Sequence, residues 1–180
     1  DGALHRLAVG DHLLLGGDNI DIAIARDVEK QWDTELGGAE WSLLCQLCRQ
    51  AKETLLNTKR KSADITLLAK GSSVLQNTRK AKLQRDELMT MLVDGFYPQV
   101  GTDEPPIPRR SGIRAMGLPY ASEPAVTRHL LAFLRYAHRL THPGTDATGT
   151  AAVFPARILF NGGSMIAPVV RQQILTTDSG

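Results

Sequence analysis

Gly162 and Gly163 occupy a place in the sequence where the backbone could approach a phosphate or a nucleotide. They follow an apolar run at 156–160 and precede a stretch with helical spacing at 167–175. Residues without a Cβ atom let a ligand lie against the backbone, and the first free amides of a helix can donate hydrogen bonds to it. The pair is not a complete dinucleotide fingerprint and brings no phosphate-loop lysine. A tight turn without a ligand therefore remains an equal alternative.

Cys45 and Cys48 have the Cys-x-x-Cys spacing that zinc ligands and redox-active cysteines share. The sequence holds only these two cysteines, so no second pair completes a four-ligand zinc site. Both fall on the apolar face of a predicted helix, which favours structural cysteines. His129, His138 and His142 are interpreted as capped or exposed side chains, and no Ser-His-Asp arrangement can be assigned. The sequence thus predicts neither a metal site nor catalytic residues.

Two basic clusters are the only sequence feature that suggests nucleic acid. Lys59, Arg60 and Lys61 form one, and Arg79 and Lys80 begin the other. Aromatic residues make up 5% of the chain and none lies among these cations. Single-stranded nucleic acid is usually bound by cations and stacking aromatics together. Solvated surface charges are the favoured interpretation.

The spacing of apolar residues predicts the elements that would position the glycines. Helical periodicity is strongest at 39–57, where apolar residues recur every three or four positions. Ser122 is expected to cap a helix at 125–140 whose first turn contains Pro124. The other predicted elements are strands at 3–9, 63–68, 74–78 and 156–160, helices at 18–32, 83–94 and 167–175, and a loop rich in proline, glycine and arginine at 98–119.

Composition limits the class of protein further. The 180 residues are 42% hydrophobic and 22% charged, which suits an ordinary globular core. The formal net charge of +2 selects no anionic partner. No apolar run reaches the roughly 20 residues of a membrane span, so a soluble cytoplasmic protein is expected. Because the chain begins at Asp1 without a methionine, it is expected to be a piece of a longer protein.

Five segments in order resemble the nucleotide-binding domain of DnaK-type (70-kDa heat-shock) chaperones. Residues 11–21 (DHLLLGGDNID) resemble the family's double-glycine segment, and 48–55 (CRQAKETL) its helix with an Ala-Lys pair. Residues 65–67 stand where its next strand begins, and 83–88 match a following helix more loosely. Residues 158–164 (ILFNGGS), followed by Pro168, are similar to its adenosine-contacting turn. Residues 117–120 and 124–134, with the long loop before them, resemble a divergent bacterial subgroup of the family.

The resemblance implies an α/β fold, namely a fragment of an actin-like ATPase (ribonuclease H-like) domain. In that fold an α+β cap lobe stands on part of a mixed sheet base. Residues 1–17 and 98–180 would belong to the base of the second ATPase lobe, and 18–97 would form the cap. The near lobe, with its phosphate-binding hairpins and catalytic groups, would precede Asp1. The chain alone is therefore expected to lack ATPase activity.

The resemblance also implies a set of nucleotide-binding residues. Lys52 matches a nucleotide-contacting lysine, Gly17 belongs to the double-glycine segment, and Gly162, Gly163 and Ser164 match the adenosine turn. The remaining positions of the site depart from the family. Arg49 stands where the family has glutamate and Glu53 where it has arginine. Leu56 stands where it has serine and Ile166 where it has a second arginine. Each lost stacking contact or hydrogen bond is typically worth about 1 kcal/mol, so adenine binding could be weakened by roughly a hundredfold or more.

The implied cofactor of the intact protein is ATP or ADP with Mg²⁺, and none is expected to stay bound to this chain. The implied partners are a peptide-binding domain of the same polypeptide, a nucleotide-exchange factor gripping 59–73, and a J-domain cochaperone. No membrane partner is expected. Two functions remain open within this fold: an ATP-binding chaperone module, and a degenerate scaffold that binds little or no nucleotide. A basic nucleic-acid-binding domain is the least favoured.

Overall fold

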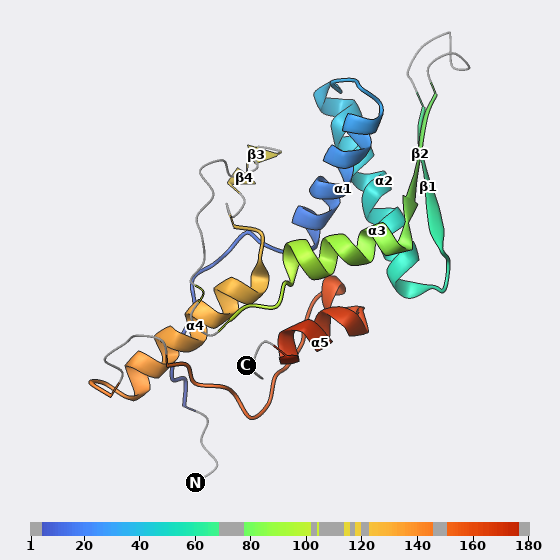
Figure 1. Ribbon diagram of the computed structural model, residues 1–180. Coiled ribbons are helices and arrows are strands. Elements are labelled where there is room, and N and C mark those ends of the chain that lie inside the picture. Colours follow the sequence, from blue (N-terminus) through green and yellow to red (C-terminus); the bar gives the residue numbers. More distant parts are fainter. Residues whose placement is uncertain are drawn as a thin grey trace.

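Two antiparallel helices, α1 and α2, are central to the hydrophobic core of the computed structural model, and Figure 1 shows them side by side. The structure describes residues 5–68, 78–101, 104, 114–115, 118–119, 123–145 and 151–176. Helix α1 spans Gly17–Gln31 and helix α2 spans Gly38–Asn57. Both were predicted from the helical spacing of their apolar residues. The structure buries most of these residues.

A β-hairpin packs beside α2. Strand β1 (Ser62–Leu67) pairs antiparallel with β2 (Arg79–Gln84), with Ser62 opposite Gln84. The first strand was predicted, whereas the second was expected at 74–78, of which 74–77 lie outside the described residues. The expected helix start at Leu83 was wrong. Leu83 is instead a buried strand residue paired with Ala63, because the hairpin alternates between two faces.

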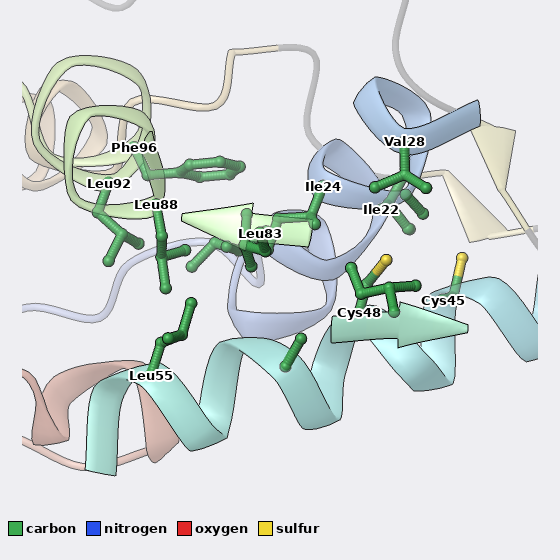
Figure 2. Packing of buried hydrophobic residues seen from close by; sticks show 14 of the residues in the cluster. Ile22, Ile24, Val28, Cys45, Cys48, Leu55, Leu83, Leu88, Leu92 and Phe96 are labelled. Carbon is green, nitrogen blue, oxygen red and sulfur yellow. The ribbon is translucent and has the colours of Figure 1, made fainter. Parts of the chain in front are cut away.

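Helix α3 (Arg85–Thr90) continues into a π-helical turn, η1 (Met91–Phe96). Its buried residues Leu88, Leu92 and Phe96 recur every four positions and face the two central helices (Figure 2). Below α3 in Figure 1 lies α5 (Pro168–Thr176), whose Val170 and Ile174 complete the same hydrophobic core. The core thus joins residues far apart in the sequence.

Helix α4 (Val126–Thr141) lies to one side of this core (Figure 1). Its N-cap is Ala125, so the expectation that Pro124 occupies the first helical turn was wrong, and Ser122 lies outside the described residues. The carboxylate of Glu123 accepts a hydrogen bond from the amide of Ala125 at 3.0 Å. This side chain, rather than a capping serine, therefore satisfies a free amide where the helix begins.

The predicted strands at 3–9 and 156–160 do not form in the described residues. Residues 5–15 and 151–160 are irregular, and the side chain of Leu159 is 94% exposed. A strand needs a neighbour to pair with its backbone, and the described residues supply none here. The strands observed are the β1–β2 hairpin and a two-residue pair, β3 (Arg114–Ala115) with β4 (Leu118–Pro119), inside the stretch predicted as a loop.

The structure therefore mixes helices with antiparallel strands, and the mixed sheet base of an actin-like ATPase is not seen among its described residues. None of the described helices has both the length and the apolarity needed to span a bilayer. What the fold does provide is a junction. The start of α1, the second half of α2 and the segment before α5 meet there.

Candidate ligand cavity

A cavity of about 460 Å³ lies at this junction. Three segments supply most of its lining: Leu15 to Asp18 with Asp21, one face of α2, and the turn from Asn161 to Ile166; Tyr97 and Val126 add to it. All eight residues expected to contact a nucleotide are part of this lining: Gly17, Arg49, Lys52, Glu53, Gly162, Gly163, Ser164 and Ile166. The two glycine pairs, which are far apart in the sequence, therefore share one cavity.

One face of α2 supplies the longest wall. Arg49, Lys52, Glu53, Leu56 and Asn57 all line the cavity, and their spacing of three and four residues places them on the same side of a helix. The opposite face of α2 is buried in the core. The helix thus carries its apolar stripe to the core and a mixed polar stripe to the cavity.

Gly17 brings the backbone of α1 close to this wall. Its carbonyl oxygen accepts a hydrogen bond from Lys52 Nζ at 2.9 Å. A Cβ atom at position 17 would lie 3.3 Å from that same Nζ atom, which is a tight contact. Before it, the amide of Gly16 donates to Asn19 Oδ1 at 2.7 Å, which fixes the first turn. A glycine at position 17 therefore lets the lysine reach the backbone.

Asp21 is the centre of the charges in the cavity wall. Its carboxylate is 4% exposed and lies 2.6 Å from Lys52 Nζ through Oδ1 and 3.0 Å from Arg49 Nε through Oδ2. Arg49 also binds Asp18. The hydrogen bond to Asp21, followed by the charge of Asp18, raises the pKa of Arg49. Both cations of the cavity thus already have carboxylate partners.

The sequence analysis did not count Asp21 among the site residues, yet the structure buries it at the cavity wall. The only signal was a charged residue between Ile20 and Ile22 in an otherwise apolar stretch. Because its two cationic partners lie on another helix, α1 alone could not reveal the burial.

The turn from Asn161 to Ile166 forms the opposite wall. Gly162 has a φ of 104°, a conformation that L side chains rarely adopt, and it precedes the short 3₁₀ helix η2 (Gly163–Ile166). A Cβ atom at Gly163 would meet no atom within 4 Å. Tyr97, which is 1% exposed, places its hydroxyl 3.4 Å from Ser164 Oγ. Burial raises the pKa of Tyr97.

Cys45 and Cys48 lie away from the cavity wall, in the core. Both are free thiols, and Figure 2 shows them pointing from α2 toward the side chains of α1. Burial raises the pKa of Cys45 to about 11 and that of Cys48 to about 12, so neither is a ready nucleophile or metal ligand. In the part of the chain that the structure describes, no group of three His, Cys, Asp or Glu side chains is arranged to hold a metal ion.

Several other residues singled out in the sequence have local partners. His138 and His142 stack with ring centroids 4.8 Å apart, and His129 Nε2 lies 3.1 Å from the carbonyl oxygen of Glu123. Arg79 and Lys82, from the basic clusters, form long ion pairs with Glu40 and Asp64, at 3.9 and 3.8 Å. These contacts account for the side chains without a ligand.

Comparison of the chain with protein-family models, with curated proteins and with solved structures found no match. Homology therefore assigns no function to the cavity. Its chemistry follows from the residues that line it.

Proposed function

We propose that the cavity binds the nucleoside part of a nucleotide, and that the chain belongs to the ATP-binding domain of a DnaK-like chaperone. The observation that supports this most is the convergence of Gly16-Gly17 and Gly162-Gly163 on one cavity, facing the polar stripe of α2. The resemblance uses order along the chain, and the shared cavity adds position in space.

The shape and chemistry of the cavity suit a nucleoside. Its volume of about 460 Å³ falls in the range of small-molecule pockets, roughly 300–1,000 Å³. Leu56 and Ile166 offer apolar surface against which the faces of a base can lie. Asn161 and Ser164 offer polar atoms that can bond to ribose hydroxyls. The glycine turn leaves open space where a side chain would otherwise stand.

The same residues do not support phosphoryl transfer by this chain. That reaction needs a metal and further cationic groups around the transferred phosphate, whereas Arg49 and Lys52 are already paired with Asp18 and Asp21. ATP or ADP with Mg²⁺ remains the cofactor that the resemblance implies, and its phosphates would be held outside the described cavity. Closure of two lobes on the nucleotide would then bias a peptide-binding domain, as in a two-state switch.

Direct titration tests the proposal. Purified chain is added to fluorescently labelled ADP and to labelled GDP, and fluorescence polarisation is measured. We expect saturable binding of labelled ADP, and competition by unlabelled ADP. Gly163→Val should weaken binding by about tenfold or more, because Gly163 lines the cavity and its added Cβ atom would stand in open space that a ligand could occupy.

Gly37→Val is the matched control. A Cβ atom at Gly37 also meets nothing within 4 Å, but this residue caps α2 at the end far from the cavity. The control should bind nucleotide as the parent chain does. Equal binding by Gly163→Val would overturn the placement of the ligand, and no binding of either nucleotide by folded chain would overturn nucleotide binding itself.

The second candidate, a scaffold of the same fold that binds no nucleotide, rests on one observation. Arg49 and Lys52, the two cations of the cavity, are both occupied by carboxylates of α1. In that case the ion pairs would simply fasten α1 to α2. A chain that circular dichroism shows to be folded and that binds neither nucleotide in the titration would favour this function over the first.

A further inference from the structure

The lining of the cavity carries more negative than positive charge. It contains two cations, Arg49 and Lys52, and three carboxylates, Asp18, Asp21 and Glu53. The phosphates of a nucleotide bring further negative charge, so a cavity that attracted them would need an excess of cations. This lining has the opposite balance and offers phosphates no net electrostatic attraction.

Both cations already bind carboxylates. Lys52 is buried, and its Nζ atom lies 2.6 Å from Asp21 Oδ1 and donates to the carbonyl oxygen of Gly17 at 2.9 Å. Arg49 donates to Asp21 through Nε at 3.0 Å and to Asp18 through Nη2. A phosphate in the cavity would therefore compete with carboxylates of α1 for either cation.

Of the two carboxylates that bind Arg49, Asp18 is the one open to solvent. The side chains of Asp18 and Arg49 are 64% and 50% exposed, whereas that of Asp21 is 4% exposed. Asp18 also stands in the first turn of α1, where the free amides of a helix would otherwise favour a phosphate. Its negative charge thus opposes a phosphate at both features that could attract one, the guanidinium of Arg49 and the start of α1.

The pair of Asp18 and Arg49 is separated from the apolar surface proposed for the base. Leu56 follows Arg49 by two helical turns on the cavity face of α2, roughly 10 Å along the helix axis. With a base against Leu56 and Ile166, phosphates that extend along the cavity would approach Arg49 and meet Asp18. A nucleoside in the same position would leave the ion pair undisturbed.

We infer that Asp18 makes the cavity a site for the nucleoside alone: by binding Arg49 it keeps the phosphates from adding affinity, so that the chain binds adenosine as tightly as ADP. This inference rests on the proposed nucleotide binding and names the part of the nucleotide that supplies the affinity. It agrees with ATP or ADP as the cofactor of an intact protein, in which cations outside the cavity would bind the phosphates.

Competition of adenosine, AMP and ADP with labelled ADP tests the inference on the full 180-residue chain. Fluorescence polarisation should give dissociation constants within about threefold of one another. A phosphate bound by an available arginine would instead separate ADP from adenosine by about tenfold or more, since hydrogen bonds to charged groups are strong enough for that ratio.

The variant Asp18→Asn removes the charge that binds Arg49 and keeps the size of the side chain, which is exposed enough to tolerate the change. The affinity for ADP relative to that for adenosine should then rise by about fivefold or more. Asp27→Asn is the matched control, because it removes the same charge from the same helix at an exposed position outside the lining of the cavity. It should leave the ratio of the two affinities unchanged.

Three results would contradict the inference. Binding of ADP about tenfold or more tighter than that of adenosine by the parent chain would overturn it and leave nucleotide binding standing. A ratio that is the same in Asp18→Asn as in the parent chain would overturn the role of Asp18. A folded chain that does not bind labelled ADP at all would overturn both the inference and the proposed function.

Discussion

Lys52 and Asp21 form a buried ion pair that joins the two central helices at the wall of the cavity. Nζ lies 2.6 Å from Oδ1, and the two side chains are 7% and 4% exposed. Removing two charges from water is costly, and the pair is tolerable because further contacts surround it. Lys52 also donates to the carbonyl of Gly17, and Asp21 also accepts from Arg49. The architecture of the cavity and the packing of α1 against α2 therefore depend on the same atoms.

Replacing Asp21 by alanine should destabilise the chain strongly. The substitution leaves Lys52 buried with its charge unmatched, and breaking a buried pair in this way typically costs about 3–5 kcal/mol. Urea unfolding followed by circular dichroism measures the change. The variant Asp27→Ala is the control on the same helix, because its side chain is 55% exposed and its pair with Lys30 spans 3.6 Å. It should change the free energy of unfolding by less than about 1 kcal/mol.

The double variant Asp21→Leu with Lys52→Met separates the two causes of this loss. It removes both charges at once, so no unpaired ion remains, and much of the stability should return. A double variant as unstable as Asp21→Ala would show that packing, rather than an uncompensated charge, dominates the effect.

Cys45 and Cys48 should make the stability fall above pH 9. Burial raises their pKa values from 9.0 to about 11 and about 12. Between pH 9 and 11 the unfolded chain loses thiol protons that the folded chain keeps, so the free energy of unfolding decreases with rising pH. Each thiol contributes about 1.4 kcal/mol per pH unit in that window, and its contribution is fully present below pH 9.

Urea unfolding at pH 8 and pH 10 checks this dependence. The parent chain should lose about 2–3 kcal/mol between the two values through its thiols. The variant with Cys45→Ala and Cys48→Ala should be less stable at pH 8, because two buried side chains are shortened, but its loss between pH 8 and pH 10 should be smaller by that amount. An identical loss in the parent and the variant would assign the effect to other groups.

The sequence predicted α1 and α2 well because a repeating apolar stripe specifies both the helix and its buried face. Arg49, Lys52 and Glu53, which the sequence resemblance grouped, line one cavity in the structure. The apolar run at 156–160 was misleading. Such a run indicates a tendency to be buried, but a strand also requires a partner strand, which local pattern does not reveal.

Leu159 offers a direct test of that failure. Because its side chain is 94% exposed, Leu159→Ser should change the free energy of unfolding by less than about 0.5 kcal/mol. Leu131→Ala on α4, where the leucine is fully buried, should cost about 2–5 kcal/mol in the same urea experiment. A loss of several kcal/mol in Leu159→Ser would mean that the segment is packed in solution, as the strand prediction expected.

Tyr97 should hold the glycine turn through its ring rather than through its hydroxyl. The ring is 1% exposed, whereas the hydroxyl lies 3.4 Å from Ser164 Oγ, which is long for a hydrogen bond between two oxygens. Tyr97→Phe keeps the ring and should cost less than about 1 kcal/mol, with nucleotide affinity unchanged. Tyr97→Leu leaves a void under the turn, so we expect a loss of roughly 1–3 kcal/mol and weaker nucleotide binding. Urea unfolding and polarisation titration on both variants check these expectations. A Tyr97→Phe variant that binds nucleotide as weakly as Tyr97→Leu would show that the hydroxyl positions Ser164.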